Sequence, residues 1–141
     1  MRDETKESWL IEGYASLFGQ ADSSGDRVRA GAFAQSLTRW PNVPMLIQHR
    51  DGARAGHWVR IVEDGRGLFV RGMVDSPGAL HLIERGLDGL SIGFRPRMQA
   101  ERTGGGRELI ALDLFEISLV HAPMLEGARF SVLGRTMKRA A

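Results

Sequence analysis

Residues 109–123 read LIALDLFEISLVHAP, and this stretch is the longest strand that the sequence predicts. Side chains alternate between the two faces of a strand, so one face carries Leu112, Leu114, Glu116, Ser118 and Val120. Both faces are mostly apolar, and a carboxylate among aliphatic side chains is costly unless it is paired. Glu116 therefore requires a basic or hydrogen-bond-donating partner across the sheet, either an arginine in a buried salt bridge or a functional group.

A second predicted strand precedes the long one and has the sequence DGLSIGFRP, residues 88–96. It places one hydroxyl, that of Ser91, between Gly89 and Gly93 on the same face. Glycine weakens the interior of a strand, and it marks a bulge, a tight packing contact or a place where a ligand approaches closely. A peptide that must reach Ser91 would be helped by such clearance. The intervening ERTGGGRE predicts a hairpin loop.

A histidine ends the apolar run VPMLIQH, which predicts a buried strand over residues 43–49. In a regular strand, His49 shares a face with Met45 and Ile47. A histidine in that position is either a structural residue or the partner that Glu116 requires.

Three of these side chains together match the groups that a serine hydrolase uses. Ser91 would attack the substrate, His49 would accept its proton, and Glu116 would hold the imidazole in one tautomer. Triads are recognised by geometry and occur in several chain orders, so the spacing alone leaves this hypothesis open.

The other patterns predict one mainly β (α+β) domain with short helices. The chain has 141 residues, of which 43% are hydrophobic and 26% charged, as expected for a single soluble domain. About seven strands and two or three helices would share its core. Further strands are predicted at 9–18, 56–64 and 67–75, and helices at 30–40 and 76–86. We assign residues 1–130 to this domain and expect 131–141 to form a flexible basic tail. A short helix is expected at the start of the stretch 126–141 that leads into it.

The composition excludes several classes of site. The chain has no cysteine, which excludes disulfides, thiolate metal sites and a cysteine nucleophile. The net charge is +2, from 19 basic and 17 acidic residues, and the arginines are scattered, so we expect no nucleic-acid partner. No apolar run reaches the length of a membrane span, so we expect a cytoplasmic protein without a membrane partner. We also expect no cofactor.

Five segments, taken in order and at their separations, resemble the prohead proteases of tailed bacteriophages and of related gene-transfer particles. They are IEGYASLFG, GDRVRAGAF, MLIQH, LIERGLDGLSIGF and LDLFEISLVHAPM, and the resemblance covers residues 9–128. It implies that His49, Ser91 and Glu116 form a Ser-His-Glu triad. It also implies a fold similar to herpesvirus assemblin, a compact β-barrel flanked by helices.

The resemblance further implies partners and a place of action. The substrates would be the scaffold and the N-terminal segment of the major capsid protein, cut inside the immature capsid in the host cytoplasm. The chain would act as a homodimer, and the portal protein is a further candidate partner. Unlike many relatives, this chain has Arg50 after the glutamine-histidine motif. His121 is an alternative third triad member, although it would point to the strand face opposite Glu116.

Two other classes of function remain open. A metal hydrolase would have to draw its ligands from the four histidines and Glu84, but no HExxH motif is present. Only His81 and Glu84 have a spacing that places two ligands on one helical turn. A non-catalytic β-barrel module that binds capsid or scaffold protein is the second alternative.

Overall fold

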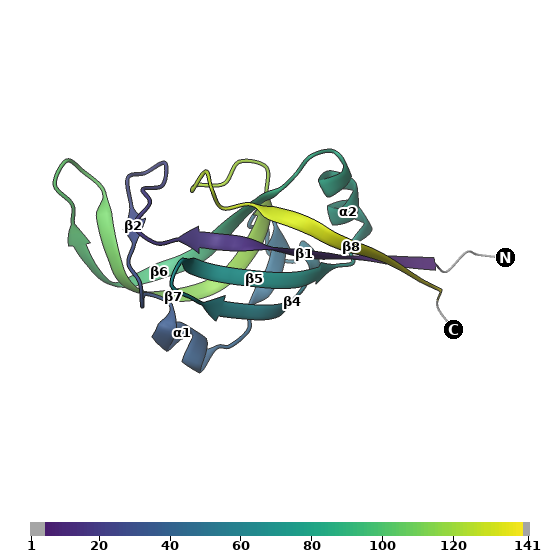
Figure 1. The fold of residues 1–141 in the computed structure, drawn as a ribbon, viewed down its shortest axis with the longest axis horizontal. Coiled ribbons are helices and arrows are strands. Elements are labelled where there is room, and N and C mark those ends of the chain that lie inside the picture. Colours follow the sequence, from purple (N-terminus) through teal and green to yellow (C-terminus); the bar gives the residue numbers. More distant parts are fainter. Residues whose placement is uncertain (1–4, 140–141) are drawn as a thin grey trace.

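The computed structural model describes residues 5–139, and the chain forms mostly β-strands with two short helices (Figure 1). The mainly β class expected from the sequence is confirmed. In chain order the elements are β1 (Thr5–Leu17), β2 (Arg27–Val28), α1 (Ala34–Arg39), β3 (Pro44–Ile47), β4 (Arg54–Glu63), β5 (Gly67–Val74), α2 (Pro77–Glu84), β6 (Gly89–Glu101), β7 (Arg107–Val120) and β8 (Phe130–Arg139).

Strand β7 pairs with three other strands of the one eight-stranded sheet that residues 5–139 form. The hydrogen-bonded order is β2-β7-β3-β4-β5-β1-β8, and β6 pairs with β7 along its length. β3 runs parallel to β7 with Leu46 opposite Ser118, and β6 runs antiparallel with Ser91 opposite the same residue. Segments that lie far apart in the sequence are therefore brought to one short stretch of β7.

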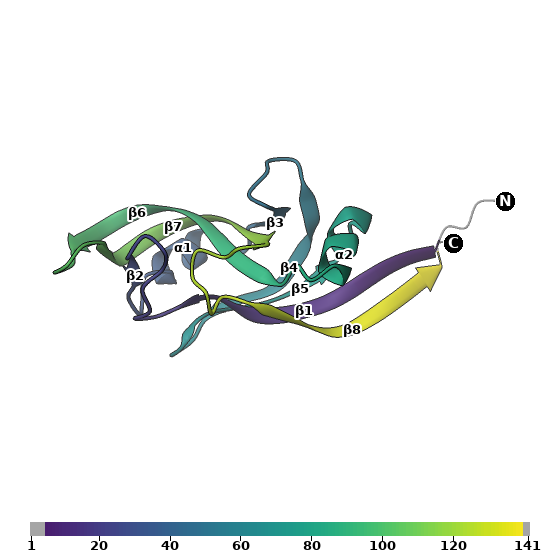
Figure 2. The same ribbon diagram turned by 90° about the horizontal axis from the view of Figure 1, so that it is seen from above.

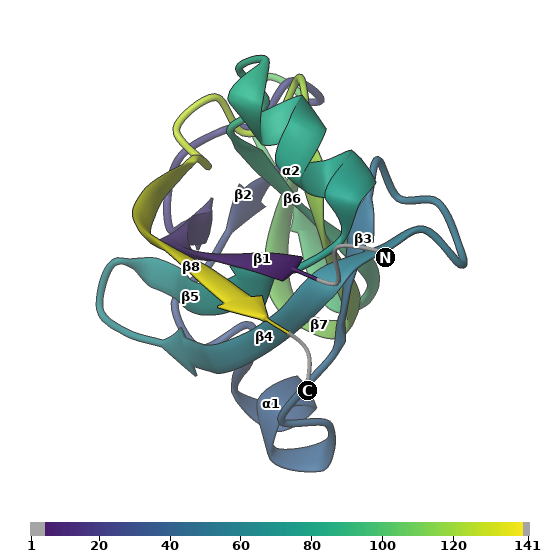
Figure 3. The same ribbon diagram turned by 90° about the vertical axis from the view of Figure 1, so that its right-hand side faces the viewer.

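The start of β6 approaches the segment that precedes β8. Gly89, the first residue of β6, forms an isolated bridge with Arg129, which lies immediately before β8. The N–H of Leu90 also donates to the carbonyl of Ala128 at 2.9 Å. Figure 3 shows the strands arranged around a common interior. The eight strands thus form the expected barrel-like arrangement. Between β6 and the segment before β8, a single bridge replaces the continuous ladder that would close the barrel.

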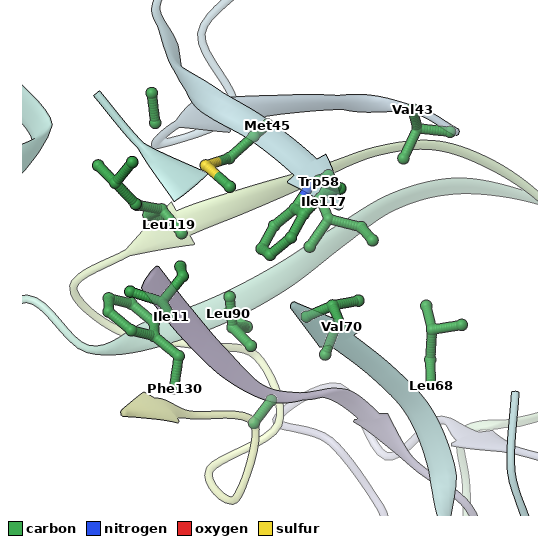
Figure 4. Close-up of a cluster of buried hydrophobic side chains, with 14 of the residues drawn as sticks. Ile11, Val43, Met45, Trp58, Leu68, Val70, Leu90, Ile117, Leu119 and Phe130 are labelled. Carbon is green, nitrogen blue, oxygen red and sulfur yellow. The ribbon is translucent and has the colours of Figure 1, made fainter. Parts of the chain in front are cut away.

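Aliphatic and aromatic side chains fill the interior of the curled sheet (Figure 4). Leu90 of β6 and Ile117 and Leu119 of β7 have no exposed surface. Burial of each such side chain stabilises the fold by roughly 1.5–3 kcal/mol, which favours this register over one shifted by a residue. Because Ile117 and Leu119 point inward, Glu116 and Ser118 lie on the opposite face of β7.

Residues 130–139 form strand β8, so the short helix and the flexible tail are wrong for these residues, while 140–141 lie outside the described part of the chain. β8 pairs antiparallel with β1, from Phe130 opposite Gly13 to Arg139 opposite Thr5. The two strands form a ribbon that extends beyond α2 (Figure 2). The basic residues and Gly134 in this segment give no clear alternation of apolar and polar side chains. The strand that pairs with it lies more than a hundred residues earlier in the chain.

Helix α2 begins and ends as its sequence predicts. The hydroxyl of Ser76 accepts a hydrogen bond from the N–H of Ala79, and Pro77 occupies the first turn. Gly86, with a φ of +108°, follows the helix end. Within residues 5–139, neither helix is long and apolar enough to span a membrane.

Candidate active site

His49 lies on a tight turn at the end of β3. The strand ends at Ile47, and Gln48 and His49 adopt left-handed backbone conformations with φ of 54° and 59°. The predicted continuation of the strand through His49 is therefore wrong. Two consecutive non-glycine residues in this region cost roughly 1–3 kcal/mol each, so the surrounding structure must hold them there.

Strand β7 and the residue after it supply the groups that hold this turn. The N–H of Gln48 donates to the carbonyl of Leu119 at 2.9 Å, and the N–H of His49 donates to Oγ of Ser118 at 3.1 Å. The side-chain oxygen of Gln48 accepts the N–H of His121 at 2.8 Å. The turn is thus attached to the end of β7 at three points, which sets the position of the His49 imidazole.

The imidazole of His49 contacts both other residues of the predicted triad. Its Nδ1 forms a short hydrogen bond with Oε1 of Glu116, and its Nε2 lies 3.0 Å from Oγ of Ser91. With the ring proton on Nδ1 facing the carboxylate, Nε2 is free to accept the proton of the Ser91 hydroxyl. The structure therefore brings together three side chains from β6, β7 and the turn after β3.

Glu116 is held on its other side by a buried hydroxyl. Oγ of Ser118 donates to Oε2 of Glu116 at 2.6 Å, and Ser118 has no exposed surface. The side chain of Glu116 is only 13% exposed. Of the two partners that the sequence left open for this carboxylate, the structure has the histidine and not an arginine.

The two glycines that flank Ser91 make room for protein groups. A Cβ at Gly93 would collide with the carboxylate of Glu116, which lies opposite it on β7. A Cβ at Gly89 would lie 2.6 Å from the carbonyl oxygen of Val120 and 2.8 Å from Cδ of Pro123. The space beside the two glycines is thus filled by the carboxylate of Glu116 at Gly93 and by Val120 and Pro123 at Gly89, so the close-packing explanation holds for both.

Within residues 5–139, no other histidine side chain hydrogen-bonds to His49, Ser91 or Glu116. The side chains of His57 on β4, His81 on α2 and His121 after β7 are exposed. His121 contacts the turn only through its backbone N–H, which donates to Gln48. The nitrogen Nδ1 of His49, which a third triad residue would contact, is bonded to Glu116. In the part of the chain from residue 5 to residue 139, no three His, Asp or Glu side chains are grouped so as to hold a metal ion.

Comparison with known proteins places the chain in a family. The sequence model described as "Caudovirus prohead serine protease" matches residues 1–141, the whole chain. The chain belongs to this family. The prohead protease of Enterobacteria phage HK97 is 37% identical to it over 93 residues, which is 60% of this chain and 41% of the phage protein. This prohead protease family member therefore spans about two fifths of the length of that relative.

Solved herpesvirus proteases share the fold. The Kaposi's sarcoma herpesvirus protease, in complex with a hexapeptide phosphonate inhibitor, aligns with a TM-score of 0.56 and 14% identity, covering 94% of this chain and 66% of that one. The varicella-zoster virus protease aligns with a TM-score of 0.51 and 19% identity, covering 76% and 57%. At these identities the likeness concerns the fold, and it confirms the expected assemblin-like architecture.

Two further residues of the site in this prohead protease family member are not predicted by the sequence. Ser118 hydrogen-bonds both Glu116 and the backbone of His49. The side chain of Gln48, which the pattern predicts as part of a strand, hydrogen-bonds His121 and holds the turn. The spacing of Glu116 and Ser118, two residues apart on one strand face, was the signal available for the first.

Proposed function

We propose that the chain is a serine endopeptidase in which Ser91, His49 and Glu116 act as nucleophile, base and orienting carboxylate. The observation that carries this proposal is the double contact of the His49 ring, with Ser91 on one nitrogen and Glu116 on the other. Membership of the prohead serine protease family supports the same reaction class.

The reaction follows from this geometry. Oγ of Ser91 attacks the carbonyl carbon of the scissile peptide bond while Nε2 of His49 takes the hydroxyl proton. Glu116 stabilises the resulting imidazolium through its bond to Nδ1 and remains ionised. His49 then gives the proton to the leaving amine as the C–N bond breaks, which leaves an acyl group on Ser91. A water molecule, deprotonated by His49, attacks the acyl carbon, and the carboxylic acid product leaves as the hydroxyl of Ser91 is restored.

The turn after β7 is the proposed source of donors for the negatively charged oxygen of the intermediate. Met124 and Leu125, which belong to this turn, line the same pocket as Ser91. Backbone N–H groups that approach Ser91 from this side would stabilise the developing charge before the substrate arrives.

The proposed substrates are the N-terminal segment of the major capsid protein and the scaffold. Support comes from the family description and from the HK97 relative, both of which are named for the prohead. Segments that are extended in the immature shell can add a strand to a sheet edge, which suits cleavage of a peptide backbone. The proposed site of action is inside the immature capsid in the host cytoplasm, with the chain as a homodimer.

Cleavage of a major capsid protein from the same genome tests this function. The chain, Ser91→Ala and the control Ser131→Ala, which alters an exposed serine on β8, are each incubated with the capsid protein, and products are sized by mass spectrometry. We expect one shortened capsid protein with the chain and with Ser131→Ala, and none with Ser91→Ala. Cleavage by Ser91→Ala that a chelator stops would favour a metal hydrolase, and binding without any cleavage would favour a non-catalytic module.

A further inference from the structure

An apolar pocket of about 150 Å³ has Ser91 in its wall. A cavity of about this volume with aliphatic walls holds a benzene-sized molecule, so this one has room for a substantial side chain. Its apolar wall is formed by Leu17, Val28, Ile92, Phe94, Leu109 and Leu125. A site beside the proposed nucleophile, lined in this way, is suited to an apolar group of the substrate.

Three charged residues also line the pocket, namely Asp22, Asp26 and Arg107, and the last two form an ion pair. Nη2 of Arg107 donates to Oδ2 of Asp26 at 2.6 Å, and Nε lies 3.2 Å from both carboxylate oxygens. The backbone N–H of Arg107 donates to Oδ1 at 2.9 Å. These bonds hold the pKa of Asp26 below its ordinary value. The carboxylate is therefore ionised and fully occupied by its partner, and it offers no charge to a ligand.

The third nitrogen of the guanidinium also has a hydrogen-bond partner. Nη1 of Arg107 donates to the side-chain oxygen of Gln99 at 3.2 Å. The side chain of Asp26 is 7% exposed and that of Arg107 is 39% exposed, so the pair is partly shielded from solvent. An acidic side chain entering the pocket would lose its water and meet the carboxylates of Asp22 and Asp26, with Arg107 already paired.

The loop that carries Asp26 is held in place independently of any ligand. Oδ1 of Asp22 accepts the N–H groups of Ser24 and Asp26 at 2.9 and 3.0 Å, and the N–H of Ser23 donates to the carbonyl of Met124 at 2.8 Å. The loop is thus tied to the segment that forms the opposite part of the wall. The pocket is consequently formed before substrate binds, which lowers the ordering cost of selecting one side chain.

We infer that this pocket selects one neutral, apolar side chain of the substrate near the scissile bond, and that the carboxylates beside the paired Arg107 exclude acidic side chains. The inference rests on the peptidase function proposed above. In the ladder of β6 with β7, Ser91 lies opposite Ser118 while Arg107 lies opposite Glu101, so the ion pair lies toward the hairpin end of the pocket. A peptide attacked by Ser91 would therefore place one flanking side chain in this pocket.

The test removes the positive charge of Arg107 from the pocket and measures how the preferred residues around the cleaved bond change. The chain and Arg107→Met are each given a proteome-derived peptide library, and the residues around every cleaved bond are identified by mass spectrometry. We expect the unaltered chain to prefer aliphatic or aromatic residues at one position. Arg107→Met frees the carboxylate of Asp26, so Lys and Arg should be enriched at that position by about tenfold or more relative to aliphatic residues.

A matched control removes an ion pair elsewhere. Arg71→Met breaks the 2.8 Å ion pair between Arg71 on β5 and Glu12 on β1, which lies outside the pocket. This variant should leave the cleavage profile unchanged. A second variant, Val28→Phe, narrows the pocket without altering charge. It should shift the preference from large to small aliphatic residues by about tenfold, and it keeps the test valid if Arg107→Met fails to fold.

The possible outcomes separate this inference from the proposed function. Cleavage by the unaltered chain with a preference for charged residues at every position would overturn the inference alone. So would folded, active Arg107→Met and Val28→Phe proteins with unchanged profiles. A folded, unaltered chain that cleaves no peptide and no capsid protein would overturn the peptidase function, and the inference with it.

Discussion

Ser118→Ala removes a hydroxyl that connects two parts of the proposed triad. Ser118 is fully buried, donates to Glu116 at 2.6 Å and accepts the N–H of His49 at 3.1 Å. A hydrogen bond to a charged group contributes about 1.5–3 kcal/mol. If Glu116 orients the imidazole only while this bond holds, loss of that amount in the transition state lowers kcat by about tenfold to about 150-fold.

The folded state should also lose stability in this variant. The N–H of His49 would be left without its acceptor, which costs about 1–3 kcal/mol, and His49 already has a left-handed backbone. Ser36→Ala is the matched control. Ser36 is equally buried and its hydroxyl accepts the N–H of Leu114 at 2.9 Å, but it lies on α1 and contacts none of the three triad residues.

The assay measures kcat and KM on a cleaved peptide, together with the free energy of unfolding in urea. We expect both variants to lose stability and only Ser118→Ala to lose kcat, with KM nearly unchanged because the hydroxyl does not line the pocket beside Ser91. Equal kcat values for Ser118→Ala and the unaltered chain, measured on folded proteins, would refute the positioning role. A parallel fall in kcat for Ser36→Ala would assign the effect to general destabilisation.

Three further predictions follow from other contacts. Gly93→Ala should lower kcat at least a hundredfold, measured with the same peptide, because the new Cβ would displace the carboxylate of Glu116. The bonds from Arg107 lower the pKa of Asp26, so their stabilisation is complete above the unfolded-state pKa of about 3.9 and is lost as pH falls through the lower folded-state pKa. The difference in unfolding free energy between the unaltered chain and Asp26→Asn should therefore be large at pH 7 and shrink near pH 3. Removal of residues 130 to the end should abolish cooperative thermal unfolding, because it exposes the edge of β1 and takes away a buried part of the core.

Each of these predictions has its own control or contrary result. Gly134→Ala adds a Cβ in open space and should leave kcat unchanged. An Asp26→Asn difference that stays constant from pH 7 to pH 3 would show that the ion pair does not stabilise the fold. An unchanged melting temperature after truncation at Arg129 would be the behaviour of a flexible tail, and it would contradict the pairing of β8 with β1.

The sequence predicts which side chains belong to the candidate site, but it does not predict the strand register that brings them together. Glu116 attracts attention because a carboxylate among aliphatic residues needs a partner, and the resemblance to prohead proteases selects Ser91 and His49 from the available hydroxyls and histidines. The register that unites them could not be predicted, because it depends on β3 and β6 both pairing with the same residues of β7. The backbone turn at Gln48 and His49 depends in turn on acceptors supplied by that distant strand.

In the fold, too, elements that depend on neighbouring residues could be predicted, and elements that depend on distant parts of the chain could not. Helix α2 was predictable because its capping serine, first-turn proline and terminal glycine are neighbours in the sequence. Strand β8 was missed because its stability comes from pairing with β1 at the other end of the chain. Ser118 was missed for a similar reason, since its role depends on a loop that reaches it from another strand.

Active-site labelling tests the central claim most directly, namely that His49 and Glu116 make Ser91 a nucleophile. The folded chain is treated with diisopropyl fluorophosphate, in which attack by an activated serine forms an O–P bond and releases fluoride, and the modified residue is mapped by mass spectrometry. We predict one adduct, on Ser91, which is lost in His49→Ala and retained in Ser131→Ala. Labelling of another serine, or equal labelling of Ser91 in the folded chain and in His49→Ala, would contradict the account.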